Sequence, residues 1–101
     1  MNRATQHAIT AKAQEIATDG MYDAMKKYMA GLVTYTEAIR IIKGLELDGL
    51  AEFDSRYVNG LLTAEENGFA ECFITLAACE YITKLAKDRM KDIRTGKCYE
   101  S

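Results

Sequence analysis

Few side chains in this 101-residue chain have the type and spacing that catalysis or metal binding requires. His7 is the only histidine, and no second ligand type lies three or four residues after it. A zinc site or a general base needs such partners. Cys72 and Cys79 lie seven residues apart on one face of a predicted helix, where free cysteines usually pack as small apolar side chains. These residues predict no nucleophile and no metal site.

Known catalytic and cofactor motifs are also missing from the sequence. Helical metal proteins of the carboxylate type pair glutamates with Glu-x-x-His, which does not occur here. Neither of the glycine-rich phosphate-binding patterns occurs. Glu71 and Glu80 are nine residues apart, so the 100° step of a helix places them nearly opposite each other, and we expect them to solvate its outer face. The sequence therefore predicts a protein without enzymatic activity and without a cofactor.

Charge is divided unevenly along the chain. Nine acids and three bases lie between Glu37 and Glu80, whereas six bases and two acids lie between Lys84 and Lys97. The basic end suits the last turns of a helix, where cations interact favourably with the helix dipole. The acidic middle is either a solvated face or a surface for a basic partner. The candidate partner-binding acids are Glu46, Asp48, Glu52, Asp54, Glu65 and Glu66.

Tyrosines are the side chains most typical of a recognition surface, because they combine apolar area with one polar group. Tyr22 and Tyr35 flank the first predicted turn and are the candidate recognition aromatics. Tyr28 and Tyr57 occupy equivalent places before two turns, and we expect them to cover the ends of their helices.

Two segments are near copies of each other, YMAGLVTYTE at 28–37 and YVNGLLTAEE at 57–66. Glycine in each copy suits the residue after a helix, where a positive φ is required, and the following leucine is predicted to fold back on that helix. Threonine and the glutamate three residues later form the pattern of a capping box, which begins the next helix. The repeat thus predicts two tight helix–helix connections.

Hydrophobic periodicity between these turns predicts three helical arms, at about residues 4–30, 35–59 and 64–95, with a frayed tail at 97–101. Gly44 and Asp48-Gly49 predict a kink or a split in the middle arm. Asp19-Gly20 could either break the first arm or lie inside it. The chain has no proline, which fits long helices. We expect a single all-α domain, an elongated up-down-up bundle.

The last arm carries apolar residues at alternating steps of three and four, which is typical of a coiled coil. We call this set the seam. Its members are Phe69, Cys72, Leu76, Cys79, Ala86, Met90 and Ile93, and Thr83 occupies one further position as a polar residue. A second apolar stripe on the same arm (Phe73, Ile74, Ala77, Tyr81 and Leu85) widens the apolar surface. Because one small chain cannot cover so long a helix on all sides, the sequence predicts a homodimer, or a higher homo-oligomer, that associates through residues 64–95.

The cytosol is the predicted compartment. Three cysteines without C-x-x-C spacing argue against a disulfide framework and favour a reducing environment. The first ten residues lack the apolar run of a signal peptide. The most apolar segment, residues 72–79, is too short to span a bilayer.

Residues 36–68 also resemble the recognition helix and wing of winged-helix regulators, in which L-x-x-D-G-L leads into a short hairpin and L-T-x-x-G starts the next helix. The resemblance implies a DNA-binding regulator with Thr34–Lys43 as recognition helix and Ala64–Thr95 as dimerisation helix. Charge opposes it, because only Arg40 and Lys43 are basic on that helix, and DNA binding requires phosphate neutralisation.

The sequence as a whole favours a non-enzymatic helical protein that binds another protein with a basic surface. Adaptors, regulators and inhibitors fit this description, including phage and mobile-element accessory proteins that block a host protein. The winged-helix regulator is the alternative, and nucleic acid is the less favoured partner.

Overall fold

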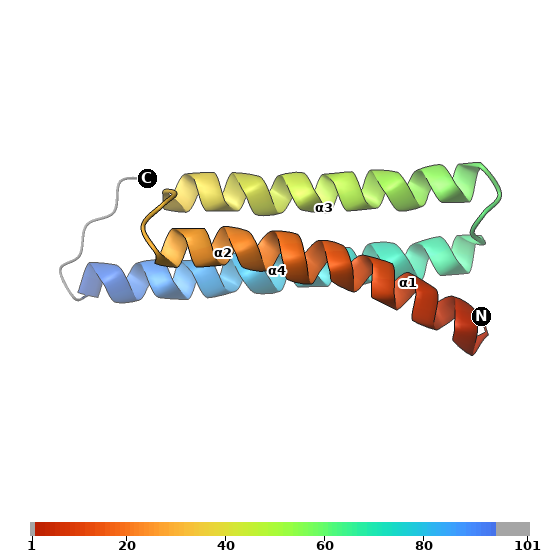
Figure 1. The fold of residues 1–101 in the computed structure, drawn as a ribbon, viewed down its shortest axis with the longest axis horizontal. Helices are drawn as coiled ribbons and strands as arrows, with labels where there is room; N and C mark the ends of the chain where they lie inside the picture. Colours follow the sequence, from red (N-terminus) through yellow and green to blue (C-terminus); the bar gives the residue numbers. More distant parts are fainter. Residues whose placement is uncertain (1, 95–101) are drawn as a thin grey trace.

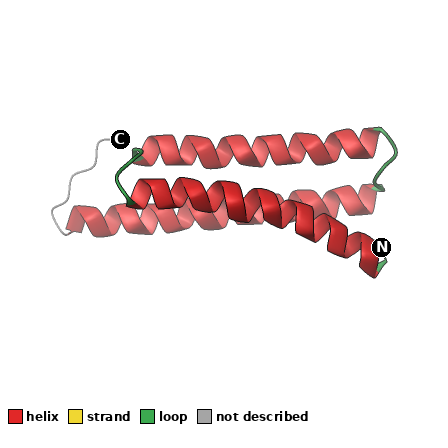
Figure 2. Cartoon of the chain, in the orientation of Figure 1, coloured by secondary structure: helices red, strands yellow, loops and turns green. Residues whose placement is uncertain are grey.

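The computed structural model describes residues 2–94, and all regular structure in that range is helical (Figures 1 and 2). The first arm consists of α1 (Arg3–Glu15), the π-helix η1 (Ile16–Met21) and α2 (Tyr22–Met29). The second is α3 (Tyr35–Val58), and the third is α4 (Ala64–Arg94). The chain reverses direction at both turns, so that the three arms lie side by side (Figure 1). The predicted all-α class is confirmed.

The two turns have the backbone chemistry that the repeat predicts. Gly31 and Gly60 adopt φ of 76° and 77°. The N–H of Leu32 donates to Lys27 O at 2.9 Å, and the N–H of Leu61 donates to Arg56 O at 2.8 Å, as in a Schellman motif. The two leucine side chains are 74% and 72% exposed, so the prediction that they fold back on their helices is wrong.

Both capping boxes that the repeat predicts are formed. Glu37 N–H donates to Thr34 Oγ1 at 3.1 Å, and Thr34 N–H donates to Glu37 Oε1 at 3.4 Å. The corresponding distances for Thr63 and Glu66 are 3.1 Å and 2.7 Å. These reciprocal hydrogen bonds satisfy donors that the first turn of a helix leaves free, which fixes the starts of α3 and α4.

The prediction of a split in the middle arm is wrong, because α3 runs as one 24-residue helix through Gly44 and Gly49. A glycine inside a helix costs about 1 kcal/mol relative to alanine, which favourable packing can offset. Gly49 is buried, and a Cβ there would meet Ile74 and Ile16 at ordinary contact distances of 3.4 and 3.5 Å. Within the segment 36–68, the part that would correspond to the wing is residues 52–56, and it lies inside this helix.

The irregularity lies instead in the first arm. Asp19-Gly20 does not end the helix but belongs to η1, where the arm changes direction (Figure 1). Gly20 lies so close to α3 that an added Cβ would be 2.7 Å from Leu45 Cδ1. A π-turn within an α-helix is a common cause of such a change in direction.

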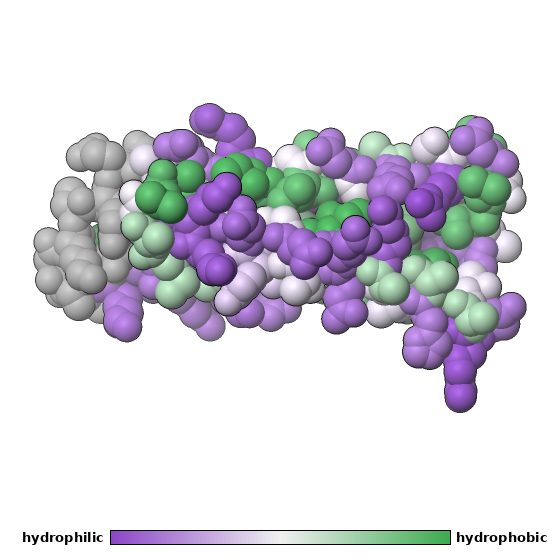
Figure 3. Space-filling view, viewed as in Figure 1, coloured by the Kyte–Doolittle hydropathy of each residue, from purple (hydrophilic) through white to green (hydrophobic). Residues whose placement is uncertain are grey.

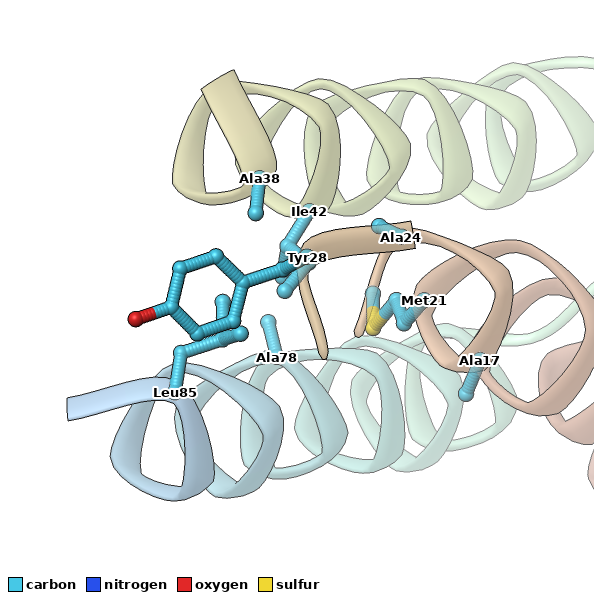
Figure 4. Close-up of a cluster of buried hydrophobic side chains, with 8 residues drawn as sticks. All are labelled: Ala17, Met21, Ala24, Tyr28, Ala38, Ile42, Ala78 and Leu85. Atoms are coloured by element: carbon cyan, nitrogen blue, oxygen red, sulfur yellow. The ribbon is translucent and has the colours of Figure 1, made fainter. Parts of the chain in front are cut away.

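Apolar side chains from all three arms form a core of two clusters. In the first, the buried ring of Tyr28 lies between α3 and α4, near Ala38, Ile42 and Leu85 (Figure 4). The second cluster contains Ile9, Ala13, Phe53, Ala70 and Ile74. Alanines at the contacts allow close approach of the helices. The result is an elongated body of 52 × 21 × 16 Å.

Three predictions fall outside the described residues. They are the end of the last arm at about residue 95, the frayed tail at 97–101, and the prediction of no disulfide as it applies to the third cysteine, Cys98.

Candidate interaction surfaces

Asn67 brings two carboxylates together at the contact between α3 and α4. Its side chain is only 8% exposed, and its Nδ2 donates to Asp54 Oδ1 and to Glu71 Oε1, both at 3.0 Å. The Oδ1 of Asn67 is buried and accepts no hydrogen bond. We call Asp54 and Glu71 the carboxylate pair. Among the side chains that the structure describes, neither member forms an ion pair with a basic group.

The pKa values of the two members of the carboxylate pair are shifted in opposite directions. A hydrogen bond with Asp54 raises the pKa of Glu71, and burial and the negative charge of Asp54 act in the same direction. Hydrogen bonds from Asn67 and Glu71 lower the pKa of Asp54. The pair therefore holds a proton on Glu71 more readily than an isolated glutamate would, because two adjacent carboxylates resist carrying two charges.

Sequence reasoning missed this arrangement. It placed Glu71 on the outer face of the last helix, which is wrong, since Glu71 faces α3 through Asn67. One signal was present: Asn67 precedes Ala70 and Ile74 at helical spacing, so an amide stands on the apolar stripe of α4. A buried amide usually has a polar partner.

The other predicted acids do not form one surface. Glu52 faces the first arm, where its Oε1 lies 3.7 Å from Lys12 Nζ and 3.0 Å from Arg56 Nη2. Asp54 lies on the opposite flank of α3, toward α4. Glu66 is occupied in its capping box. Asp48 and Glu65 are exposed, and Glu46 is half-buried. Asp54 is thus the only one of the six that joins the carboxylate pair.

The two candidate aromatics differ in exposure. Tyr22 is exposed, with Lys26 Nζ 5.7 Å from its ring centroid. Tyr35 packs against Tyr28, with the ring centroids 6.0 Å apart, and Arg89 lies over it at 5.6 Å. Tyr35 therefore helps to join α3 to α2 and α4, and only Tyr22 is open to a partner.

Most of the seam lies on the side of α4 opposite the core, whereas Phe69 packs against the second core cluster. Ala70, Ile74, Ala78 and Leu85 are the buried residues of α4 that face the other arms. The seam residues are mostly exposed, with Leu76 at 64%, Ile93 at 63% and Met90 at 54%, while Phe69 and Ala86 are half-buried. Cys72 and Cys79 are exposed free thiols, so the prediction that they pack in the core is wrong.

A hollow of about 370 Å³ lies between the start of α1 and the turn from α3 to α4. Ile9, Phe53 and Leu62 contribute apolar walls, and Lys12 and Arg56 line its polar side. Apolar surface is visible at this end of the molecule (Figure 3). Both bases already pair with Glu52, so the hollow offers little free charge to orient a ligand.

His7 is exposed on α1. No group of three or more histidine, cysteine or acidic side chains in residues 2–94 is arranged to hold a metal ion. None of the helices in that range combines the length and apolar character needed to cross a bilayer.

Comparison with protein-family models, with curated proteins and with solved structures gave no match. Function must therefore be inferred from the surfaces themselves.

Proposed function

We propose that this protein works by binding another protein that has a basic surface, and that the carboxylate pair is the centre of the docking site. The observation that carries this proposal is the placement of Asp54 and Glu71 side by side with no basic partner among the side chains that the structure describes. An arginine of a partner could contact both carboxylates at once, and such charge-assisted hydrogen bonds are the strong ones.

The net negative charge of residues 37–80 favours a basic partner. Asp48 and Glu65 are exposed on the same two helices, and residues 37–80 carry a large excess of acids over bases. Such a surface attracts basic partners and speeds their association. An inhibitor or regulator of a protein that normally holds nucleic acid fits this chemistry, as does a phage or mobile-element accessory protein acting on a host protein in the cytosol.

Self-association through the seam is part of the proposal. Each chain would contribute an up-down-up bundle, and two chains would cover each other's seam. Contiguous exposed apolar surface of this kind is typical of an interface. The single observation behind this step is that residues spaced as in a coiled coil are exposed while the opposite stripe of α4 is buried.

The docking site is tested by capture of partners from the native host with the wild-type chain and with Asp54→Asn/Glu71→Gln. We expect one protein to be enriched on the wild type and to lose at least about tenfold in affinity for the variant, because two charge-assisted contacts are removed. The matched control is Glu15→Gln/Asp19→Asn, which removes two exposed acids from the first arm.

Circular dichroism must show that both variants keep their helical content. Equal loss of binding by the control variant would contradict a specific docking site. Duplex DNA, titrated over a series of salt concentrations, is the second probe. Strong salt-dependent DNA binding would replace this proposal with that of a nucleic-acid-binding protein.

A further inference from the structure

Helix α4 has opposite charges at its two ends. Residues 64–80 contain four acids, namely Glu65, Glu66, Glu71 and Glu80, and no base. Residues 81–94 contain five bases and two acids. Two such helices packed in parallel would place acid beside acid and base beside base. Packed antiparallel, the acidic end of each would lie along the basic end of the other, which is the favourable arrangement for flanking charges in a coiled coil.

The seam is also symmetric about its midpoint. Its eight positions, with Thr83 included, are separated by steps of three, four, three, four, three, four and three. This series reads the same from either end, with its centre at Tyr81. An antiparallel partner can therefore meet all eight positions at once. The seam extends about 36 Å from Phe69 to Ile93 at the rise of an α-helix, or more than three heptads.

We infer that α4 packs antiparallel against α4 of a second copy of this chain, with the two seams in full overlap. This inference rests on the self-association proposed above and adds its geometry. Phe69 then lies opposite Ile93 of the second copy, Cys72 opposite Met90, and Leu76 opposite Ala86. The remaining layer joins Cys79 to Thr83, so the polar hydroxyl meets a small thiol rather than a bulky apolar side chain.

Two of the four layers match a large side chain with a small one, which suits close packing, and the layer of Phe69 and Ile93 joins two large ones. Leu76 faces a half-buried alanine, and Met90 faces a cysteine. Glu80 lies beside the two-fold axis, near the same residue of the second copy. The ion pair of Glu80 with Lys84, at 3.1 Å, supplies a positive charge there that offsets the repulsion.

The arrangement has a consequence for partner binding. Glu71 of one chain and Glu71 of the other would be separated by about 30 Å along the paired helices, since 20 residues of helix lie between them. The two carboxylate pairs would therefore sit toward opposite ends of the dimer. Such a dimer presents two docking sites to two basic surfaces, whereas a parallel dimer would hold its acidic ends together.

The use of the seam is tested by the mass of the protein in solution, measured by light scattering after size-exclusion chromatography. We expect a dimer for the wild type and at least about a 100-fold weaker association for Leu76→Asp, which places a charge in the interface. The matched control is Leu47→Asp on α3, where the leucine is also 64% exposed. It should remain a dimer.

The orientation is tested by disulfide formation in Met90→Cys after mild oxidation with diamide. Antiparallel overlap brings Cys72 to position 90 of the second copy, and peptide mapping should find that bond. The two positions are about 27 Å apart within one chain, far beyond the reach of a disulfide. A bond found between them must therefore join two chains.

The possible outcomes distinguish the antiparallel orientation from the self-association on which it rests. A parallel, in-register dimer would instead give bonds from Cys72 to Cys72 and from Cys79 to Cys79, which would overturn the orientation alone. A dimer without the bond from Cys72 to position 90 would overturn it as well. A wild-type monomer would overturn the self-association, and a Leu76→Asp dimer would overturn the use of the seam. Either result leaves acidic docking to be judged by its own capture experiment.

Discussion

At the scale of single residues, the carboxylate pair links the function proposed here to the stability of the fold. Asn67 holds Asp54 and Glu71 together across the contact of α3 with α4. A carboxyl whose pKa is raised on folding contributes stability below its unfolded pKa and loses it as the pH rises through the folded value. Glu71 behaves in this way, whereas Asp54, whose pKa is lowered, contributes stability that is lost as the pH falls.

We therefore predict that Glu71→Gln raises the melting temperature at pH 7. An amide donates a hydrogen bond to Asp54 at every pH and carries no charge, so the repulsion between two ionised carboxylates disappears. The gain should shrink as the pH is lowered, because Glu71 of the wild type, whose pKa is raised, then takes up a proton. Thermal unfolding followed by circular dichroism at pH 7 and at successively lower pH measures the effect.

Glu80→Gln is the matched control for that series, because Glu80 lies on the same helix but pairs with Lys84. Its removal should give no gain at pH 7. A melting temperature that falls in Glu71→Gln at pH 7 would show that the two carboxylates do not repel each other in the folded chain.

At the scale of helices and turns, local chemistry decides some features and contacts between helices decide others. The two turns follow from a few adjacent residues, so Gly31 and Thr34 were sufficient to predict the first of them. The break predicted near Gly49 did not occur, because burial of α3 against the other arms outweighs the low helix propensity of two glycines.

The features that sequence missed all depend on residues far apart in the chain. The close approach of Gly20 to Leu45, near the π-helix, joins the first arm to the second. The carboxylate pair forms across 17 positions of sequence, which no local pattern encodes. The seam, by contrast, was predicted from its spacing as the surface facing a second chain, and most of its residues are exposed.

A pair of glycine substitutions separates backbone conformation from packing. A Cβ added at Gly44 or at Gly31 would meet nothing within 4 Å, so neither substitution creates a clash. Gly44 lies inside α3, where alanine should stabilise the protein by about 0.5–1 kcal/mol. Gly31 has φ of 76°, where alanine should cost about 1–2 kcal/mol. Urea unfolding of Gly44→Ala and Gly31→Ala measures both free energies, and shifts in the same direction would contradict the assigned turn geometry.

At the scale of the whole molecule, the body is thin and elongated, and α4 carries one buried and one largely exposed apolar stripe. The principal extents of 52 × 21 × 16 Å leave α4 on the outside, with Leu76, Met90 and Ile93 in water. Pairing two chains along α4 would turn these side chains into a second core. The dimer would then contribute to the stability of each chain as well as to the number of its docking sites.

The melting temperature of a protein that dissociates when it unfolds depends on protein concentration, and this dependence tests the proposed dimer. If unfolding is coupled to dissociation, each tenfold rise in concentration adds about 1.4 kcal/mol to the dimer. For two chains of this length, the melting temperature should rise by about 3 °C per tenfold. Calorimetry of the wild type over two decades of concentration should show this rise, and Leu76→Asp should show none. A wild-type melting temperature that stays constant would mean that the seam is not covered by a second copy when the chain unfolds.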